Sequence, residues 1–87
     1  MSYTVVLHPK AKRELGRLPH DVFQHVDPVI WSLRDQPRPM GVKKLEGQTH
    51  RVRIGNWRVI YAILDDDQRV VILRVTRRSE RTYKDLW

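Results

Sequence analysis

Three arginines in the C-terminal half of the chain occupy positions that a β-hairpin would bring together. Arg51 and Arg53 alternate along one stretch, and Arg58 follows the turn-forming pair Gly55-Asn56. A two-residue turn at this pair would make Arg53 face Arg58, and strand alternation would put Arg51 on the same side. Like charges that face each other destabilise a sheet. The spacing therefore predicts an anion site on this face, unless the side chains simply extend into water, where their repulsion is screened.

A second basic group follows the last expected strand. Extending the strand pairing through a turn at residues 66–67 predicts that Arg77 continues on the side of the other arginines. Arg78 is suited to stabilising the negative charge of a phosphoryl transition state. Tyr83 is suited to stacking on a base, to moving a proton, or to packing a terminal helix on the sheet. The other residues of this strand that we expect on the arginine side are Arg69, Val71, Leu73 and Val75.

The N-terminal half predicts one strand and two helices that would support the hairpin. Residues 3–7 are rich in β-branched side chains and predict a strand. Pro9 is suited to the first turn of a helix, which Pro19 would end. Apolar residues three and four apart over residues 22–33 indicate a second, amphipathic helix.

Proline complicates the second helix and the segment after it. Pro28 would remove a helical hydrogen bond and clash with the preceding turn. Either the helix kinks there, or Asp27 caps a new helix with Pro28 in its first turn. Residues 36–49, with two glycines and the pair Lys43-Lys44, predict a loop.

The C-terminal half predicts three strands followed by a short helix. The strands are expected over residues 51–54, 57–64 and 69–76, and the helix over 78–86. The order is then β-α-α-β-β-β-α. This order predicts an α+β fold, a single domain of residues 1–87 in which two N-terminal helices pack on a mostly antiparallel sheet of about four strands.

The composition favours a polyanionic partner. The 87 residues carry 17 Lys and Arg against 10 Asp and Glu, a net charge of +7. Twelve of these cations are arginine, which favours bidentate phosphate contacts. The chain has no cysteine, no apolar run near the ~18 residues of a membrane span, and no signal-peptide pattern at its first residues. We therefore expect a cytoplasmic protein with no membrane partner.

The remaining polar residues do not predict a metal or cofactor site. His20 and His25 are five residues apart and do not share a helix face, and the acidic run 65–67 is typical of a solvated turn. His50 adjoins Arg51 and is expected to be a solvated loop residue or to reach the arginine face. No Gly-rich phosphate loop or nucleophile elbow is present.

Taken together, these segments resemble the RelE/ParE superfamily of bacterial toxins, and more closely its RelE branch, the ribosome-dependent mRNA interferases. The resemblance covers nearly the whole chain. The segments that carry it are Pro9-Lys10-Ala11, Lys43-Lys44-Leu45-Glu46-Gly47, Arg51 through Tyr61, and the basic tail to Tyr83.

The resemblance implies a RelE-like fold and an endoribonuclease that cuts mRNA in the ribosomal A site. The ribose 2′-hydroxyl attacks the adjacent phosphate, so that neither metal nor cofactor is required. The residues that match the family's catalytic set are Arg51, Arg53, Arg58, Arg78 and Tyr83. The other cations expected to contact RNA are Lys43, Lys44, Arg77 and Arg81.

One departure bears on the mechanism. The family pattern has lysines where this chain has Arg51 and Arg53, and arginine retains its proton in proteins. These two residues can therefore bind phosphate but are poor general bases. The base that the resemblance leaves open is Tyr83, His50 or a group of the ribosome.

The resemblance also implies partners and leaves two other functions open. The expected partners are a cognate antitoxin, the ribosome with its mRNA, and operator DNA bound only through the antitoxin complex. One alternative is a ParE-like toxin that inhibits DNA gyrase without cutting nucleic acid. The other is a non-enzymatic subunit that only binds nucleic acid.

Overall fold

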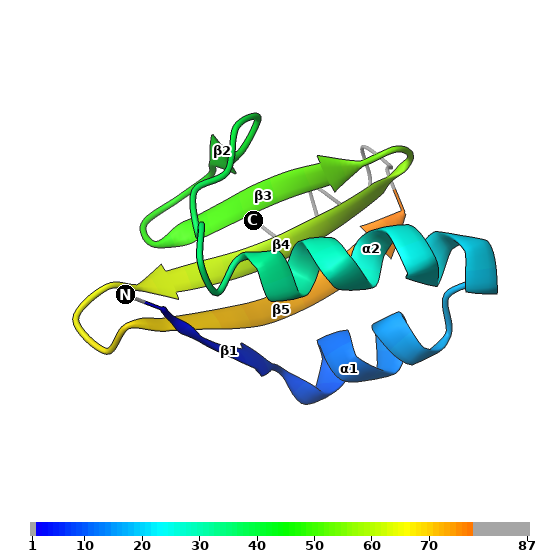
Figure 1. The fold of residues 1–87 in the computed structure, drawn as a ribbon, viewed down its shortest axis with the longest axis horizontal. Coiled ribbons are helices and arrows are strands. Elements are labelled where there is room, and N and C mark those ends of the chain that lie inside the picture. The colour runs from blue at the N-terminus through cyan, green and yellow to red at the C-terminus, as the bar shows by residue number, and fades with distance from the viewer. Residues whose placement is uncertain (1, 78–87) are drawn as a thin grey trace.

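Two helices cover one face of a five-stranded sheet in the computed structural model, which describes residues 2–77 (Figure 1). The helices are α1 (Pro9–Gly16) and α2 (His20–Ser32). The strands are β1 (Thr4–Leu7), β2 (Lys43–Lys44), β3 (Thr49–Ile54), β4 (Trp57–Leu64) and β5 (Arg69–Arg77). The α+β class and the packing of both helices on the sheet are confirmed. The helix predicted over residues 78–86 lies outside the described residues.

The sheet is mixed, with the strand order β1-β5-β4-β3-β2. β1 runs parallel to β5, and every other neighbouring pair is antiparallel. The two-residue strand β2 was not predicted, because Lys43 and Lys44 lie among glycines and loop residues. Both lysines pair with β3, which makes five strands instead of about four.

Local sequence explains how α1 begins, and α2 continues through its proline. At α1, the backbone N–H of Lys10 donates to Nδ1 of His8 at 3.2 Å, and Pro9 occupies the first turn. α2 contains Pro28 in its interior, so the second of the two alternatives, a new helix capped by Asp27, is wrong. Asp27 instead accepts a hydrogen bond from Nε1 of Trp31 at 3.0 Å.

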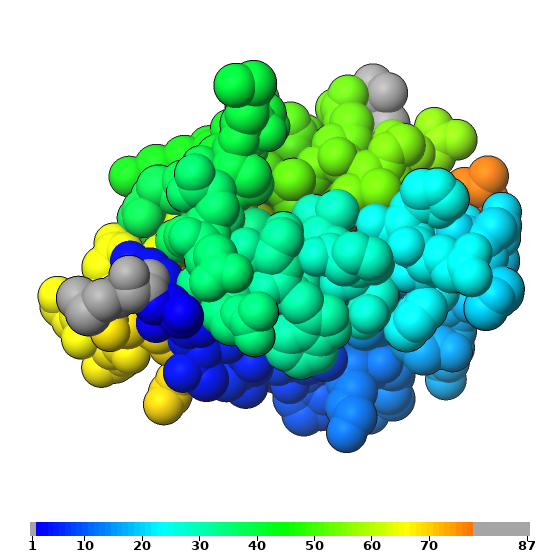
Figure 2. Space-filling model, in the orientation of Figure 1, coloured from blue at the N-terminus to red at the C-terminus, as the bar shows by residue number. Residues whose placement is uncertain are grey.

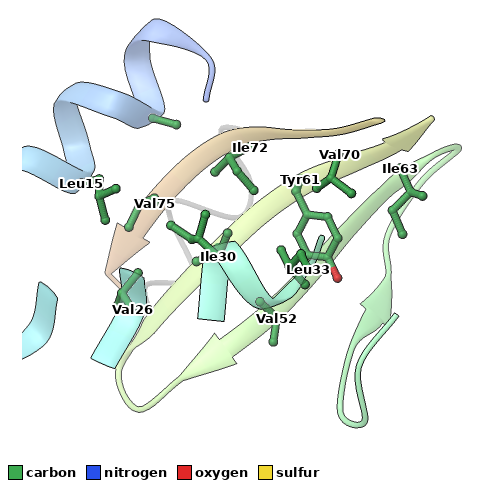
Figure 3. Close-up of a cluster of buried hydrophobic side chains, with 12 residues drawn as sticks. Leu15, Val26, Ile30, Leu33, Val52, Tyr61, Ile63, Val70, Ile72 and Val75 are labelled. Atoms are coloured by element: carbon green, nitrogen blue, oxygen red, sulfur yellow. The ribbon is translucent and has the colours of Figure 1, made fainter. Parts of the chain in front are cut away.

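The core lies between the helices and the inner face of β4 and β5 (Figure 3). Tyr61 is its largest fully buried side chain and lies among residues of both layers. The Tyr61 hydroxyl donates to the carbonyl oxygen of Pro37 at 2.8 Å, which ties the segment after α2 to the sheet. Burial raises the pKa of this phenol to about 12. In the space-filling view the two helices occupy much of this side of the molecule (Figure 2).

Removing the Tyr61 hydroxyl is expected to destabilise the protein. In Tyr61→Phe the Pro37 carbonyl loses its buried partner, which should lower the free energy of unfolding by about 1–2 kcal/mol. Because the folded state raises this pKa, the neutral phenol contributes stability that is complete below pH 10 and is lost as the pH rises toward about 12. Urea unfolding at neutral pH and between pH 10 and 12 measures both effects.

The control for this prediction is Tyr3→Phe. It removes a hydrogen bond of 2.7 Å from the Tyr3 hydroxyl to Oδ1 of Asp65, which is exposed, and should cost less than Tyr61→Phe. Equal losses in the two variants would contradict the role given to the buried bond. An alkaline loss of stability that persists unchanged in Tyr61→Phe would contradict the titration argument.

The two helices are short. Neither helix in the described residues 2–77 is long and apolar enough to cross a bilayer.

Candidate nucleic-acid interface

The hairpin of β3 and β4 places its arginines on one side of the sheet, as the sequence predicted. Arg53 pairs with Arg58, and Ile54 pairs with Trp57. Arg51 pairs with Ile60, two positions along β4 from Arg58 and therefore on the same side. The intervening residues of β4 belong to the core beneath the helices, so the arginine side chains lie on the opposite face.

β2 extends this arrangement with one of its two lysines. Lys43 pairs with Arg51 and therefore shares its side, whereas Lys44 pairs with His50 on the helix side. We call the residues Lys43, Arg51, Arg53 and Arg58 the cationic face. The sequence predicted that both lysines contact RNA, but the pairing brings only Lys43 to this face.

Burial differs strongly across the cationic face. Lys43 and Arg53 are exposed, Arg51 is half-buried, and Arg58 is only 5% exposed. Arg51 and Arg58 both interact with other groups of the protein. A charge in such a poorly hydrated place acts more strongly on a nearby anion than one in water. The face therefore offers exposed cations for encounter and one buried guanidinium, which β4 contributes.

A β-bulge changes the sides on which the last residues of β5 lie. Ile60 pairs with Arg74 and Tyr61 pairs with Ile72, so Leu73 is an extra residue in β5. The prediction that Val75 and Arg77 share the side of Arg58 is wrong. Val75 pairs with Val59, and Arg77 pairs with Trp57, both on the helix side.

The same bulge brings two unpredicted residues to the cationic side. Arg74 pairs with Ile60, in the row that also contains Arg51, and Thr76 pairs with Arg58. Neither was singled out in the sequence, because nothing in the composition of β5 marks the extra residue. Arg69 and Val71, which precede the bulge, lie on the predicted side.

Glu14 of α1 binds β5 immediately after the bulge. Its carboxylate accepts hydrogen bonds from Nε of Arg74 at 3.1 Å to both oxygens and from Nη2 at 2.8 Å. Its Oε1 also accepts the backbone N–H of Val75 at 2.9 Å. The nearby carboxylate raises the pKa of the Arg74 guanidinium. α1 thus fixes the end of β5 that leads to the basic tail.

His50 does not reach the cationic face. It is 5% exposed and pairs with Tyr61 on the helix side, where the two rings stack with centroids 5.9 Å apart. Its Nδ1 lies 2.9 Å from the carbonyl oxygen of Gln48, to which it donates. The prediction of a solvated loop residue is wrong, and the position of His50 removes it as the base of a reaction on the opposite face.

The acidic turn after β4 forms an ion-pair cluster. Asp65 accepts bonds from Arg38 at 2.9 and 3.3 Å and from the Tyr3 hydroxyl at 2.7 Å, and these partners lower the pKa of its carboxyl. Across residues 2–77 no group of three or more His, Cys, Asp or Glu side chains is arranged to hold a metal ion.

Three predicted site residues lie outside the described part of the chain: Arg78, Arg81 and Tyr83.

Comparisons with known proteins point to one family. A family model described as the ParE toxin of the type II toxin-antitoxin system parDE matches residues 5–82. The chain is 34% identical over 90 residues to the putative toxin RelE1 of Methanocaldococcus jannaschii, covering 98% of this chain and 99% of that protein. It is 38% identical over 81 residues to toxin RelE of Mycobacterium tuberculosis, covering 88% of this chain and 82% of that protein.

Solved structures show the same fold. The archaeal RelE-RelB complex of Pyrococcus horikoshii matches with a TM-score of 0.81 and 30% identity, over 91% of this chain and 98% of that chain. The toxin-antitoxin complex RelBE2 of Mycobacterium tuberculosis matches with a TM-score of 0.78 and 33% identity, over 90% and 100% of the two chains. The isolated RelE toxin of E. coli is only 20% identical, so this match shows a shared fold and nothing more. Its TM-score is 0.77, over 98% of this chain and 96% of that chain.

Proposed function

The chain belongs to the RelE/ParE superfamily, as a RelE-like toxin of a type II toxin-antitoxin system, and we propose that it is an endoribonuclease that cuts mRNA on the ribosome. The single observation that supports the RNA-cutting function best is the pairing of Arg53 with Arg58 on the side of the sheet away from the helices. Two like charges held face to face are balanced best by an anion, and RNA supplies one at every phosphate.

In the proposed reaction the exposed cations and the buried cation have different roles. The exposed Lys43 and Arg53 attract and position the RNA backbone. Arg58, which is poorly hydrated, stabilises the extra negative charge that develops when the 2′-hydroxyl attacks the phosphate. The chemistry that this scheme assigns to the chain is charge stabilisation, which needs no metal.

The general base is proposed to come from outside residues 2–77. Arg51 and Arg53 retain their protons, and His50 lies on the other face of the sheet. The proposed candidates are therefore Tyr83 or a group of the ribosome, and Arg78 is proposed as a further cation that stabilises the phosphate. Arg77, on the helix side of β5, remains a proposed RNA contact, and so does Arg81.

We propose a cognate antitoxin as the protein partner. Two of the similar structures are complexes of a RelE toxin with a RelB antitoxin. Binding of operator DNA is proposed only for the toxin-antitoxin complex, and action on ribosomes places the free toxin in the cytoplasm.

Primer extension on mRNA from cells that express the protein tests the nuclease. Cuts inside codons that appear within minutes of induction, together with a halt of protein synthesis, are the expected result. The alternative that the family match favours is a ParE-like toxin directed at DNA gyrase. Intact mRNA together with an early halt of DNA replication would favour that alternative and overturn the nuclease.

The two adjacent lysines of β2 provide a matched test of the cationic face. Lys43→Ala should weaken RNA binding and lower the slope of log K against log salt by about 0.7, the value for one phosphate contact to a single strand. Lys44→Ala removes the same charge from the other side of the strand and should change the slope little. Fluorescence anisotropy of a short labelled RNA at several salt concentrations measures both.

The comparison of the two lysines is decisive because both are exposed and neighbours in sequence. Equal slopes in both variants would mean that RNA binding follows net charge and not the face of the sheet.

A further inference from the structure

A hollow of about 300 Å³ lies at the end of β5, beyond Ile72, where the pairing with β1 stops. Its lining residues come mainly from this end of β5 and from the C-terminal end of α1. Its wall includes the indole of Trp57, which is only half-buried. An aromatic ring at the wall of a hollow that reaches solvent is a platform on which a base can stack.

The charge of the hollow is positive. Three arginines line it, together with Glu14. Glu14 is bound to Arg74, so its charge is balanced within the wall. The remaining two arginines, Arg17 and Arg77, are exposed, and Arg77 lies directly across from Trp57 in the strand pairing. A ring and two guanidinium groups are thus available together, which suits a base with its phosphate.

Thr76 links the hollow to the cationic face. It lines the hollow, and it pairs with Arg58 in the sheet. Thr76 is 6% exposed, and its Oγ1 has no hydrogen-bond partner among the residues that the structure describes. A buried hydroxyl without a partner is costly and is normally satisfied by another group. Because the pairing puts Thr76 on the side of Arg58, a polar atom of RNA bound on the cationic face would satisfy it.

We propose that this hollow binds one nucleotide of RNA, with its base stacked on Trp57 and its phosphate held by Arg17 and Arg77. The inference rests on the proposed function, because it places the nucleotide at the same strand end as the phosphate assigned to Arg58, on the other side of the sheet. It goes further by naming a nucleotide site on the helix side of the β5 end. The chain then contacts its RNA on both faces of the sheet at the end of β5.

Binding of a single nucleotide tests the site without any cleavage. In heteronuclear NMR of the full chain, adenosine 5′-monophosphate should shift the indole N–H signal of Trp57 and the backbone N–H signal of Arg77. Ribose 5-phosphate, which lacks the base, should shift Arg77 but leave the indole nearly unchanged. A Trp57 indole signal that does not respond to the nucleotide overturns the proposal, whether or not the protein cuts mRNA.

Matched variants test which side chains hold the nucleotide. Trp57→Leu should weaken binding roughly ten-fold or more, the range for loss of one stacked base. Trp31→Leu, at an exposed tryptophan of α2, is its control and should bind as the wild type does. Arg17→Ala should weaken binding several-fold, while Arg13→Ala removes an exposed arginine of α1 outside the hollow and should have little effect.

The outcomes separate the site from the nuclease. Loss of nucleotide binding in Arg17→Ala but not in Arg13→Ala supports the site even where no mRNA cleavage is found. Equal losses in both variants indicate attraction by net charge alone and overturn it. Because the wild-type NMR titration needs no variant, misfolding of Trp57→Leu would leave the decision to that measurement.

Discussion

Replacing Arg58 by methionine is expected to lower the rate of mRNA cleavage about 10²- to 10³-fold, the usual loss when one preorganised donor to a transition-state charge is removed. Arg58 is suited to this role because it lies opposite Arg53 and is only 5% exposed. Its charge is therefore little weakened by water and needs no reorganisation when the phosphate gains negative charge. Cleavage of a defined mRNA on purified ribosomes, measured at saturating toxin, gives the rate.

Methionine is the appropriate replacement because of the same burial. Alanine at a side chain this buried would leave a gap in the packing and confound the loss of charge with a loss of stability. Methionine keeps an unbranched apolar stem of similar length. Urea unfolding of Arg58→Met identifies any destabilisation, and Arg58→Lys, which keeps a charge without the planar fork, should retain part of the activity.

Replacing Arg53 should have a different effect from replacing Arg58. Arg53 is exposed, so Arg53→Met should mainly weaken RNA binding and leave the rate at saturating toxin closer to that of the wild type. A folded Arg58→Met protein that cuts mRNA within about three-fold of the wild-type rate would remove Arg58 from the mechanism, since the loss expected for such a donor is far larger.

The hairpin was predictable because its register follows from local rules. A glycine in the turn with φ of 58° fits a two-residue connection, and this turn fixes every pair from Ile54 and Trp57 onward. The alternation of side chains then places Arg51, Arg53 and Arg58 without any knowledge of the rest of the molecule. The alternate residues Val59, Tyr61 and Ile63 form the other face of β4, which packs under the helices.

Contacts between distant segments explain what the sequence did not predict. Lys43 and Lys44 form a strand because β3 offers them an edge, and not because their own composition favours one. Pro28 is tolerated inside α2, because the buried residues Val26 and Ile30, with Leu33 directly after the helix, hold it on the sheet on both sides of the proline. His50 is buried because its partner across the hairpin is Tyr61.

The bulge in β5 had the largest effect on the predicted site. One extra residue reverses the sides of all residues that follow, so it moved Arg77 to the helix side and placed Thr76 opposite Arg58. No residue of β5 marks the bulge in the sequence. The group that binds to it, Glu14, lies some sixty residues earlier in the chain and is the one acidic residue of α1. The energetic role of this contact is open to direct measurement.

Glu14→Gln is expected to lower the free energy of unfolding by about 2 kcal/mol. The carboxylate accepts bonds from Arg74 with both oxygens and from the backbone N–H of Val75 with one of them. A glutamine offers a single acceptor, and its amide N–H₂ would face donors. The guanidinium and the carboxylate are each about one-fifth exposed, so water restores only part of the loss. Urea unfolding measures the change, and Glu46→Gln, at an exposed glutamate, is the control.

A double-mutant cycle separates the ion pair from the backbone contact. Arg74→Gln removes the cation but leaves the bond between Glu14 and the Val75 N–H, so it should cost less than Glu14→Gln. The coupling energy between the two sites should be about 1–2 kcal/mol, as for residues in direct contact. If Glu14 fixes the bulge, amide hydrogen exchange at Val75 should become faster in Glu14→Gln and change less in Arg74→Gln. Unchanged exchange at Val75 in Glu14→Gln would mean that the bulge is held by strand pairing alone, and that α1 has no part in deciding which residue of β5 lies beside Arg58.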